Sequence, residues 1–486
     1  MTTAPTIAVV GAGFTGLLTA RRLRAAGVAT VVLEASARPG GQLRTVEMAR
    51  VPVDVGAEAM HLGAPGAAEL LEDLGLLGDS VTARTGTSWL LTSGGLRPLP
   101  AGVGPAGPTR LRPVVRSGVM SLRGLARAGM EPLLTRTGRV APLGEEEDVA
   151  VGDFVAARFG DQVADRFVDP LLGSLHAGDV RTLSLRACAP ALVPTATAGT
   201  SLVARRRGRP TPRMSFVTWP EGLVRVVDRL AGELGADVRT GTAVRSLERR
   251  GGRWRLHLAR TQGSAVHGSV AHGTRQSVDG STIDVDGVVL AVSSAVAAPL
   301  LRDLVPAATE LLAQTARADV ATVLLALPRD RVADVRALTG TGVLVPSSVG
   351  SLLKAATFLS TKWAHLDLAD TVLVRLSAGR AGDDRLAELD DDELVSRLRE
   401  DLAIFTGVDA TPDEVLVERW PAAMPQLTVG HTVRLASART ALTVHAPGVV
   451  LAGSSYDGIG LASCAASARQ AADALLTHLQ PSKDLA

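Results

Sequence analysis

The first apolar residues of the chain follow the spacing of a strand, a helix and a second strand. Residues 7–10 are apolar and mostly β-branched, which is typical of a strand buried on both faces. Residues 14–26 place leucines at helical spacing and are followed by Gly27, the residue type that helix C-termini favour. A second apolar run, 29–33, leads to Glu34. The pattern predicts a β-α-β unit that ends on an acidic residue.

A glycine-rich turn, Gly11-x-Gly13-x-x-Gly16, joins the first strand to the helix. Glycines at these positions permit a tight turn, close approach of the backbone to a pyrophosphate, and close packing of helix on strand. The helix N-terminus would offer N–H groups and a positive dipole to the phosphates. Glu34 would accept hydrogen bonds from a ribose diol, and its charge would disfavour a 2′-phosphate. The unit predicts a site for an ADP-ribosyl group, which leaves both NAD and FAD open.

Two more glycine-rich segments extend this pattern. Gly40-Gly41 and Arg44 would let the backbone and a guanidinium approach a diphosphate from its second side. Near the other end of the chain, the apolar run 449–452 is followed by a turn with Gly458 and Gly460 and then by a helix. Because such pieces come from both ends of the chain, we expect a nucleotide domain that is discontinuous in sequence.

The segment Glu34-Ala35-x-x-x-x-Gly40-Gly41-x-x-Arg44-Thr45 resembles the second FAD fingerprint of the flavin amine oxidase superfamily. In that superfamily the counterpart of Gly56-Ala57-Glu58 lies against the flavin ring, and the counterpart of Val244 contacts the adenine. The resemblance implies FAD, and non-covalent FAD because residues 420–430 contain no cysteine. The residues that it implies as cofactor-binding are Gly11, Ala12, Gly13, Phe14, Thr15, Gly16, Glu34, Ala35, Gly40, Gly41, Gln42, Arg44, Gly56, Ala57, Glu58, Ala59, Val244, Trp420, Gly453, Ile459, Gly460 and Leu461.

The strand–helix rhythm stops in the middle of the chain. An arginine-rich stretch, 110–139, precedes a helix whose aromatic residues are expected to be core and which should close at Asp169-Pro170. Residues 237–244 are expected to add a strand to the nucleotide domain, and the basic segment 204–213 is expected to be a surface loop. Residues 260–282, rich in Gly, Ser and His, are expected to form a flexible hairpin insertion.

These patterns predict an α/β fold with three parts. The parts are a Rossmann-like, discontinuous FAD-binding domain (1–80, 214–300 and 440–480), a mainly helical lobe (81–213), and a mixed-sheet, β-rich substrate-binding domain (301–439).

Composition excludes several classes of protein. The 486 residues carry a formal net charge of +2, a value that does not indicate nucleic-acid binding. The two cysteines are far apart, so a redox dithiol is not expected, and the nine histidines lack metal-ligand spacing. No apolar run reaches the length of a membrane span, and we expect a cytoplasmic protein. The basic, amphipathic stretch 110–139 leaves weak association with a membrane surface open.

Three segments outside the nucleotide site narrow the resemblance to HemY-type protoporphyrinogen and coproporphyrinogen III oxidases. They are 167–190, 352–363 and 419–434, with Ser174, His176 and Leu427 as departures from the family pattern. The resemblance implies hydride transfer from a porphyrinogen methylene bridge to the flavin, O₂ as acceptor with release of peroxide, and hand-off of the product to a haem-pathway chelatase. It identifies no side chain as a catalytic acid or base.

The residues also bear on alternative functions and substrates. An amine oxidase would need two aromatics facing the flavin, whereas aromatic residues are 3% of this chain. The arginine-rich stretch favours coproporphyrinogen III, with four propionates, over protoporphyrinogen. A diverged FAD-dependent oxidase or desaturase acting on another apolar substrate stays open, as does a non-catalytic flavin- or porphyrin-binding protein.

Overall fold

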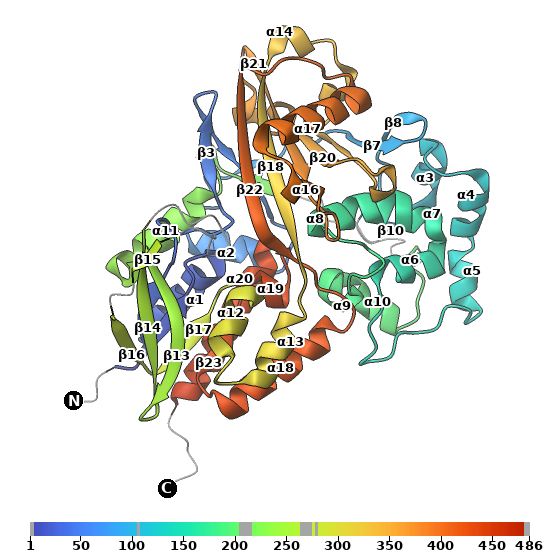
Figure 1. Ribbon diagram of the computed structural model, residues 1–486. Helices are drawn as coiled ribbons and strands as arrows, with labels where there is room; N and C mark the ends of the chain where they lie inside the picture. Colours follow the sequence, from blue (N-terminus) through green and yellow to red (C-terminus); the bar gives the residue numbers. More distant parts are fainter. Residues whose placement is uncertain (1–3, 105–106, 204–215, 263–274, 278–279, 481–486) are drawn as a thin grey trace.

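The structure, a computed structural model, describes residues 4–104, 107–203, 216–262, 275–277 and 280–480 (Figure 1). Its first sheet has five parallel strands in the order β12-β2-β1-β17-β23. The predicted strand–helix–strand unit is confirmed, because β1 and β2 enclose helix α1 and pair in parallel. The bounds are β1 Thr6–Val10, α1 Phe14–Ala25, β2 Ala29–Leu33, β12 Val238–Arg239, β17 Gly287–Leu290 and β23 Val449–Leu451. The strands come from both ends and the middle of the chain, as the glycine-rich segments indicated.

Apolar side chains cover both faces of this sheet. Ile7 and Val9 of β1 pack with α1 and with α20 (Leu461–Leu479), whereas Ala8 and Val10 pack on the opposite face. That face is covered by α12 (Ser294–Leu301), α13 (Pro306–Ala313), α18 (His431–His445) and a sheet of β13 (Thr242–Arg250), β14 (Arg253–Gln262), β15 (Arg275–Ser277) and β16 (Thr282–Val285). The period of two along β1 therefore separates two cores, as expected for a strand between helical layers.

A second, mixed sheet has seven strands in the order β22-β18-β21-β20-β19-β7-β8. Only the β19–β7 pair is parallel among these pairings. One face packs against α17 (Asp391–Thr406), and the other carries Leu324, Leu373 and Trp420 toward the hairpin of β3 (Thr45–Met48) and β4 (Val51–Asp54). The strand bounds are β7 Ser88–Thr92, β8 Gly95–Pro98, β18 Arg317–Pro328, β19 Gly342–Leu344, β20 Leu353–Phe358, β21 Thr371–Ala378 and β22 Glu414–Pro425.

The middle of the chain folds into the helical lobe, which lies beside the seven-stranded sheet (Figure 1). Its core contains the aromatic residues that the sequence assigned to it, among them Phe154, Phe159 and Phe167. The helices are α3 Leu111–Ser117, α4 Leu122–Gly129, α5 Glu131–Arg136, α6 Val151–Phe159, α7 Asp161–Val163, α8 Ser174–His176, α9 Leu185–Cys188 and α10 Val193–Thr197. Strands β7 and β8, from the segment expected to be mainly helical, extend the seven-stranded sheet. The domain limits themselves stay a prediction.

Shorter elements connect these parts. They are β5 Met60–His61, α2 Ala67–Asp73, β6 Val81–Thr82, β9 Val103–Gly104, β10 Gly107–Pro108, β11 Phe216–Thr218, α11 Val224–Leu234, α14 Arg329–Val332, α15 Leu359–Lys362, α16 Arg385–Glu388 and α19 Ser454–Asp457.

Two predictions of local structure are wrong. The helix does not close at Asp169-Pro170, because it continues as a π-helix from Ala164 to Gly173 with Pro170 inside it. Proline lacks an N–H and crowds the carbonyl four residues earlier in an α-helix, and the wider π-turn relieves that constraint. The segment 237–244 does not form one strand either. Only Val238–Arg239 joins the first sheet, whereas β13 pairs with β14 in another sheet.

The predicted hairpin insertion and basic loop fall largely on residues that the structure does not describe. Residues 260–262 continue β14, 275–277 form β15, and 282 begins β16, whereas 263–274 and 278–279 lie outside the described residues. All of 204–213 lies outside them as well.

Helix α17 offers a matched test of the core on one face of the seven-stranded sheet. Leu402 is 1% exposed and packs in that core, whereas Ile404, two residues further, is 69% exposed. We expect Leu402→Ala to lower the free energy of unfolding by about 2–5 kcal/mol, and Ile404→Ala to change it by less than about 0.5 kcal/mol. Urea denaturation followed by circular dichroism measures both. Equal effects of the two variants would contradict the assigned packing.

Candidate functional site

The first glycine turn is shaped by close backbone contacts. A Cβ on Gly16 would lie 1.9 Å from the carbonyl oxygen of Gly11, so this residue must be glycine for the helix to pack on the strand. Gly11 has φ +99°, and a Cβ there would lie 2.7 Å from the carbonyl oxygen of Ala291. Gly13 differs, because nothing lies within 4 Å of a Cβ placed on it. The turn therefore leaves open space at the N-cap of α1, where a ligand could approach the helix N-terminus.

The second glycine segment lies directly beside the first. Gly40 donates its N–H to the carbonyl of Ala12 at 2.8 Å, and a bridge joins Gly13 to Gly40. A Cβ on Gly41 would lie 3.3 Å from the Cα of Gly13. Two loops separated in sequence thus form one surface, as a diphosphate site with two sides requires.

Arg38 holds the second loop in shape. Its guanidinium donates to the backbone carbonyls of Pro39 at 3.1 Å, Gly41 at 3.2 Å and Leu43 at 3.3 Å. Burial lowers the pKa of Arg38, and the nearby Arg44 adds to this effect. The sequence analysis singled out Arg44 and missed Arg38, although its place two residues before Gly40-Gly41 was a visible signal.

Glu34 is fixed by two backbone donors. Its Oε2 accepts the N–H of Ala12 at 2.8 Å and its Oε1 accepts the N–H of Ser36 at 2.8 Å. A carboxylate has about four lone-pair sites, so each oxygen keeps capacity for a further donor. Ala12 also belongs to the first glycine turn, so the carboxylate lies next to the predicted phosphate site. This geometry is compatible with a ribose diol.

The start of β13 reaches the same region. Thr242 donates its N–H to the carbonyl of Glu34 at 2.8 Å, and Val244 is half-buried two residues further along. Thr261 donates its hydroxyl to the carbonyl of Ala35. The structure thereby brings Val244 and Ala35 to the Glu34 side of the site, where the resemblance expects the adenosine part of the ligand.

Helices α1 and α20 run parallel and side by side. Thr19 Oγ1 lies 3.5 Å from the carbonyl oxygen of Ala468, and Arg22 donates to Asp473 at 2.9 Å. Residue numbers thus rise in the same direction along both helices. Gly453, with φ +120°, would place a Cβ 3.8 Å from Thr15 Oγ1. The N-terminal ends of both helices therefore point the same way, and the positive ends of their dipoles lie at the same end of the sheet.

Gly56 lies where three segments meet. A Cβ on Gly56 would lie 1.8 Å from the carbonyl oxygen of Gln42 and 3.4 Å from Cη2 of Trp420. Arg375 of β21 donates to the carbonyl of Gly56 at 2.6 Å. The predicted flavin-facing segment is thus held between the second glycine loop and the seven-stranded sheet.

Glu58 is paired with cations from two other segments. Its Oε1 accepts from Lys362 Nζ at 2.8 Å and from Trp363 Nε1 at 2.7 Å, and its Oε2 lies 3.5 Å from Arg375. Burial by itself would raise the pKa of Glu58, but the charges of Lys362 and Arg375 outweigh it and hold the pKa below its usual value. The Lys-Trp pair of segment 352–363 therefore anchors Glu58, a contact across 304 residues that the sequence did not reveal.

The segments that carry the narrower resemblance also come together. Gln426 donates its amide to the carbonyl of His176 at 3.0 Å, and Ser184 donates its N–H to the carbonyl of Leu427 at 2.8 Å. Ser174, His176 and Leu427, the departures from the family pattern, therefore lie where segments 167–190 and 419–434 meet.

The structure places every predicted cofactor residue on these connected segments. Gly11 to Gly16 form the first turn, Glu34 to Arg44 the second segment, and Gly56 to Ala59 the connection between β4 and β5, with Gly56 beside Trp420. Gly453, Ile459, Gly460 and Leu461 lie around the start of α20. Arg44 itself is paired with Glu418 at 2.5 Å. The assignment of these residues to FAD stays a prediction.

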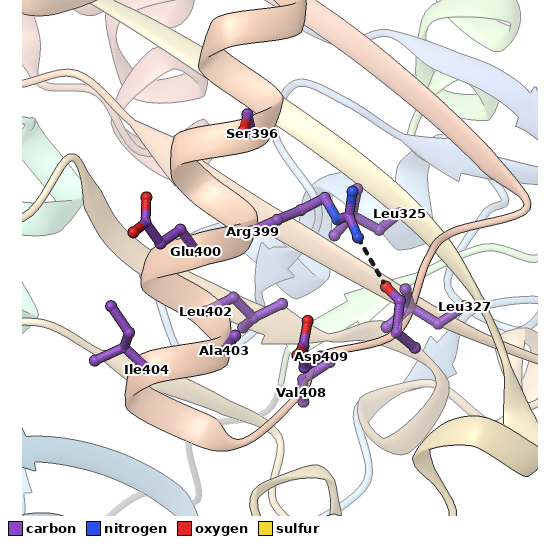
Figure 2. Close-up of a pocket in the computed structure, with 11 residues that line it drawn as sticks. Leu325, Leu327, Ser396, Arg399, Glu400, Leu402, Ala403, Ile404, Val408 and Asp409 are labelled. Atoms are coloured by element: carbon purple, nitrogen blue, oxygen red, sulfur yellow. Dashed lines mark hydrogen bonds between the residues drawn. The ribbon is translucent and has the colours of Figure 1, made fainter.

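A cavity of about 380 Å³ lies elsewhere, between α17 and β18 (Figure 2). Leu325 and Leu327 line it from β18, whereas Leu324 and Ala326 belong to the opposite face of the sheet. Arg399 donates to a backbone carbonyl across it at 3.3 Å. Because successive side chains of a strand point to opposite faces, this cavity is on the side away from Gly56 and does not belong to the candidate site.

The described residues contain no group of three or more His, Cys, Asp or Glu side chains that could hold a metal ion. Of the helices in this part of the chain, none is long and apolar enough to cross a membrane.

The chain is similar to known proteins over nearly its whole length. The model of the family described as "Flavin containing amine oxidoreductase" matches residues 14–476. The coproporphyrinogen III oxidase of Mycobacterium leprae is 34% identical over 96% of this chain and 97% of its own length, and that of Bacillus subtilis is 29% identical over 97% and 98%.

Solved structures agree with these matches. A crystal structure from Exiguobacterium sp. 255-15, assigned as a protoporphyrinogen oxidase, superposes with a TM-score of 0.82 at 26% identity and covers 99% of this chain and 100% of that one. Cyclohexylamine oxidase from Brevibacterium oxydans, at 16% identity, has a TM-score of 0.67 over 99% and 100% of the two chains and shares the fold. With a family model that matches most of its length, this chain belongs to the flavin containing amine oxidoreductases.

Proposed function

We propose that this protein is an FAD-dependent oxidase of porphyrinogens that converts coproporphyrinogen III to coproporphyrin III in haem biosynthesis. The observation that carries the proposal is the near-full-length similarity to coproporphyrinogen III oxidases, at 34% identity to the mycobacterial enzyme. The contacts of segments 167–190, 352–363 and 419–434 support it. Lys362 of the second segment pairs with Glu58 of the predicted flavin-facing segment, and the first and third segments bond each other through His176 and Gln426.

The residues fit FAD as a bound group. The open space at Gly13, the two parallel helix N-termini and the backbone of Gly40-Gly41 suit a diphosphate, and Glu34 suits a ribose diol. Bound flavin would supply a two-electron acceptor. Gly56, Trp420 and Glu58 would hold the segment that lies against its ring.

The cysteines support non-covalent binding. Covalent attachment through sulfur requires a thiolate, and burial raises the pKa of Cys188 to about 12 and that of Cys464 to about 11. Neither thiol ionises near neutral pH.

In this proposal O₂ accepts the electrons and H₂O₂ is released. The protein orients the substrate in an apolar binding site and contributes no strong base.

The surroundings of the enzyme are also part of the proposal. We place it in the cytoplasm, with weak association with a membrane surface through α3–α5. Val115, Leu122 and Leu133 are 55%, 86% and 57% exposed there, next to the exposed Arg116 and Arg123. Such a surface would also suit hand-off of the porphyrin to a chelatase.

The first prediction concerns attachment of the cofactor. Acid precipitation of the purified protein should leave the flavin in the supernatant, where its absorbance identifies it as FAD. Flavin that stays with the precipitate would contradict non-covalent binding.

The second prediction concerns Glu34. Glu34→Ala removes one or two hydrogen bonds to the ribose, each worth about 1.5–3 kcal/mol when a charged group accepts it, so FAD should bind at least about tenfold more weakly. Glu47→Ala, on an exposed position of β3, is the matched control and should bind FAD normally. Affinity is measured by fluorescence titration of deflavinated protein. Because Glu34 also accepts two backbone N–H groups, Glu34→Gln serves as a second variant that keeps part of this loop geometry. Wild-type affinity in both variants would remove Glu34 from the site.

The third prediction concerns the substrate. Coproporphyrinogen III carries four carboxylates and protoporphyrinogen IX two, so positive potential favours the former more strongly. We expect a higher kcat/KM for coproporphyrinogen III, with an advantage that shrinks as salt screens the charges. A fluorescence assay of porphyrin formation with both substrates at low and high ionic strength measures it. Equal or faster turnover of protoporphyrinogen IX would overturn the preference.

Anaerobic mixing with coproporphyrinogen III separates an oxidase from a binding protein. Bleaching of the flavin absorbance is expected for the oxidase. Porphyrin binding without bleaching would favour the non-catalytic alternative, and absence of both would favour a diverged oxidase with another apolar substrate.

A further inference from the structure

Three cationic side chains lie close together where the seven-stranded sheet meets the helical lobe. Lys354 comes from β20, Arg375 from β21, and Arg380 from the loop that follows β21. Val345 donates its N–H to the carbonyl of Lys354 at 3.1 Å and accepts from Nη2 of Arg380 at 2.9 Å, and Arg375 lies on the strand that pairs with the strand of Lys354. Lys354 is 7% exposed, a low value for a residue type that is seldom buried unless it is paired.

The register of the strands decides which way this cluster faces. Arg375 pairs with Leu324 of β18, whose side chain packs with Trp420 on the face that is turned toward Gly56. Lys354 lies at an irregularity, between the pairs Leu353–Ala378 and Ala355–Ser377. Because Arg375 also bonds the carbonyl of Gly56, the cluster begins at the predicted flavin-facing segment and extends from there toward the helical lobe.

The nearby carboxylates have other partners. Glu58 is paired with Lys362 and Arg375. Asp169 accepts the N–H of Ser347 at 2.7 Å, and its charge partly offsets the burial that lowers the pKa of Arg380. Within the described residues, the ammonium of Lys354 has no hydrogen bond and no ion pair. An unpaired ammonium on a largely buried side chain is unfavourable, so its retention here favours an anionic partner that is not part of the chain.

Other polar groups in the same place also lack partners. Nη2 of Arg380 donates to the carbonyl of Val345 at 2.9 Å, but its Nη1 is buried without a partner in the part of the chain that the structure describes. The same holds for Ser174 Oγ and His176 Nδ1. Their segment packs onto the Arg380 loop, because Ala381 donates its N–H to the carbonyl of Ala177 at 2.7 Å. Donors from the sheet and from the helical lobe therefore lie at the same junction.

The proton equilibrium of Lys354 is compatible with a ligand site. Burial, together with Arg380 and Arg375, lowers the pKa of Lys354 to about 7. The amine is then about half protonated near neutral pH. A carboxylate beside it would stabilise the charged form. The free site thus avoids a full buried charge, and the bound site gains a charge-assisted contact.

We propose that Lys354 and Arg380 bind a propionate carboxylate of the porphyrinogen and so set how the macrocycle is placed against the flavin. This inference rests on the proposed function, because it names the anchor for that substrate. Lys354 forms an ion pair with the carboxylate, and Nη1 of Arg380 donates to it. Ser174 and His176 contribute polar contacts from the helical lobe, so the two departures from the family pattern lie at the carboxylate rather than at the reacting carbon.

The test uses flavin-loaded protein and the stable product coproporphyrin III, with its tetramethyl ester as an uncharged probe of the same shape. Binding is followed by porphyrin fluorescence in the same low concentration of detergent. In Lys354→Met we expect about tenfold or greater loss of affinity for the acid, and less than about twofold change for the ester. Lys354→Arg should keep most of the affinity for the acid. Arg302→Met, which removes an exposed cation at the end of α12, is the control and should behave as wild type.

The outcomes separate this site from the proposed function. Unchanged binding of the acid by Lys354→Met overturns the site alone. Equal loss of acid and ester overturns it as well, because it assigns Lys354 a structural role, and the flavin content of each variant monitors folding. Wild-type protein that binds neither porphyrin overturns the proposed function, and the anchor with it.

Discussion

Glu58 connects the two halves of the molecule. It follows the β3–β4 hairpin of the nucleotide-binding part, yet Lys362, Trp363 and Arg375 all belong to the seven-stranded sheet and the helix that follows β20. The charged side chains here are only 14–23% exposed, so loss of one partner would leave a poorly solvated charge, and the cluster disfavours separation of these segments. The same Arg375 also bonds the carbonyl of Gly56. The position of the predicted flavin-facing segment relative to the seven-stranded sheet therefore depends on Glu58 together with the Arg375–Gly56 bond.

Successive residues of the seven-stranded sheet point to opposite faces, and the two faces differ in what they contact. Leu325 and Leu327 of β18 face α17, whereas Leu324 and Ala326 face the β3–β4 hairpin. The first face carries a conventional core with a small cavity at its border (Figure 2). The second face carries Trp420, Glu418 and Arg375, so polar and aromatic groups reach the candidate site from a rigid support. An irregularity at Lys354 interrupts this alternation close to the helical lobe, and irregularities of this kind commonly re-aim a side chain.

The sequence predicted what depends on local chemistry. The β-α-β unit and the glycine turns follow from short segments, and the structure places Gly11, Gly16 and Gly40 in backbone contacts that a side chain would prevent. Contacts between distant segments were not predictable in this way. Nothing local to Lys362 indicates that it pairs with Glu58, and nothing local to Gln426 indicates that it bonds His176. Pro170 shows the limit of a local rule, because the helix widens into a π-turn instead of ending. The resemblance identified those segments as relevant, but only the fold shows what they contact.

The distribution of positive charge gives each ligand group a different kind of partner. At the predicted diphosphate, Arg38 uses its donors to hold loop carbonyls and Arg44 is paired with Glu418, so the phosphates would depend chiefly on backbone N–H groups and on the ends of α1 and α20. Backbone donors keep their positions without any side-chain ordering, which suits a cofactor that remains bound. Near the helical lobe the situation is reversed, because no carboxylate among the described residues pairs with Lys354. A side-chain cation with a lowered pKa can gain its proton when an anion arrives and lose it when the anion leaves, which suits a substrate that must be exchanged at every turnover.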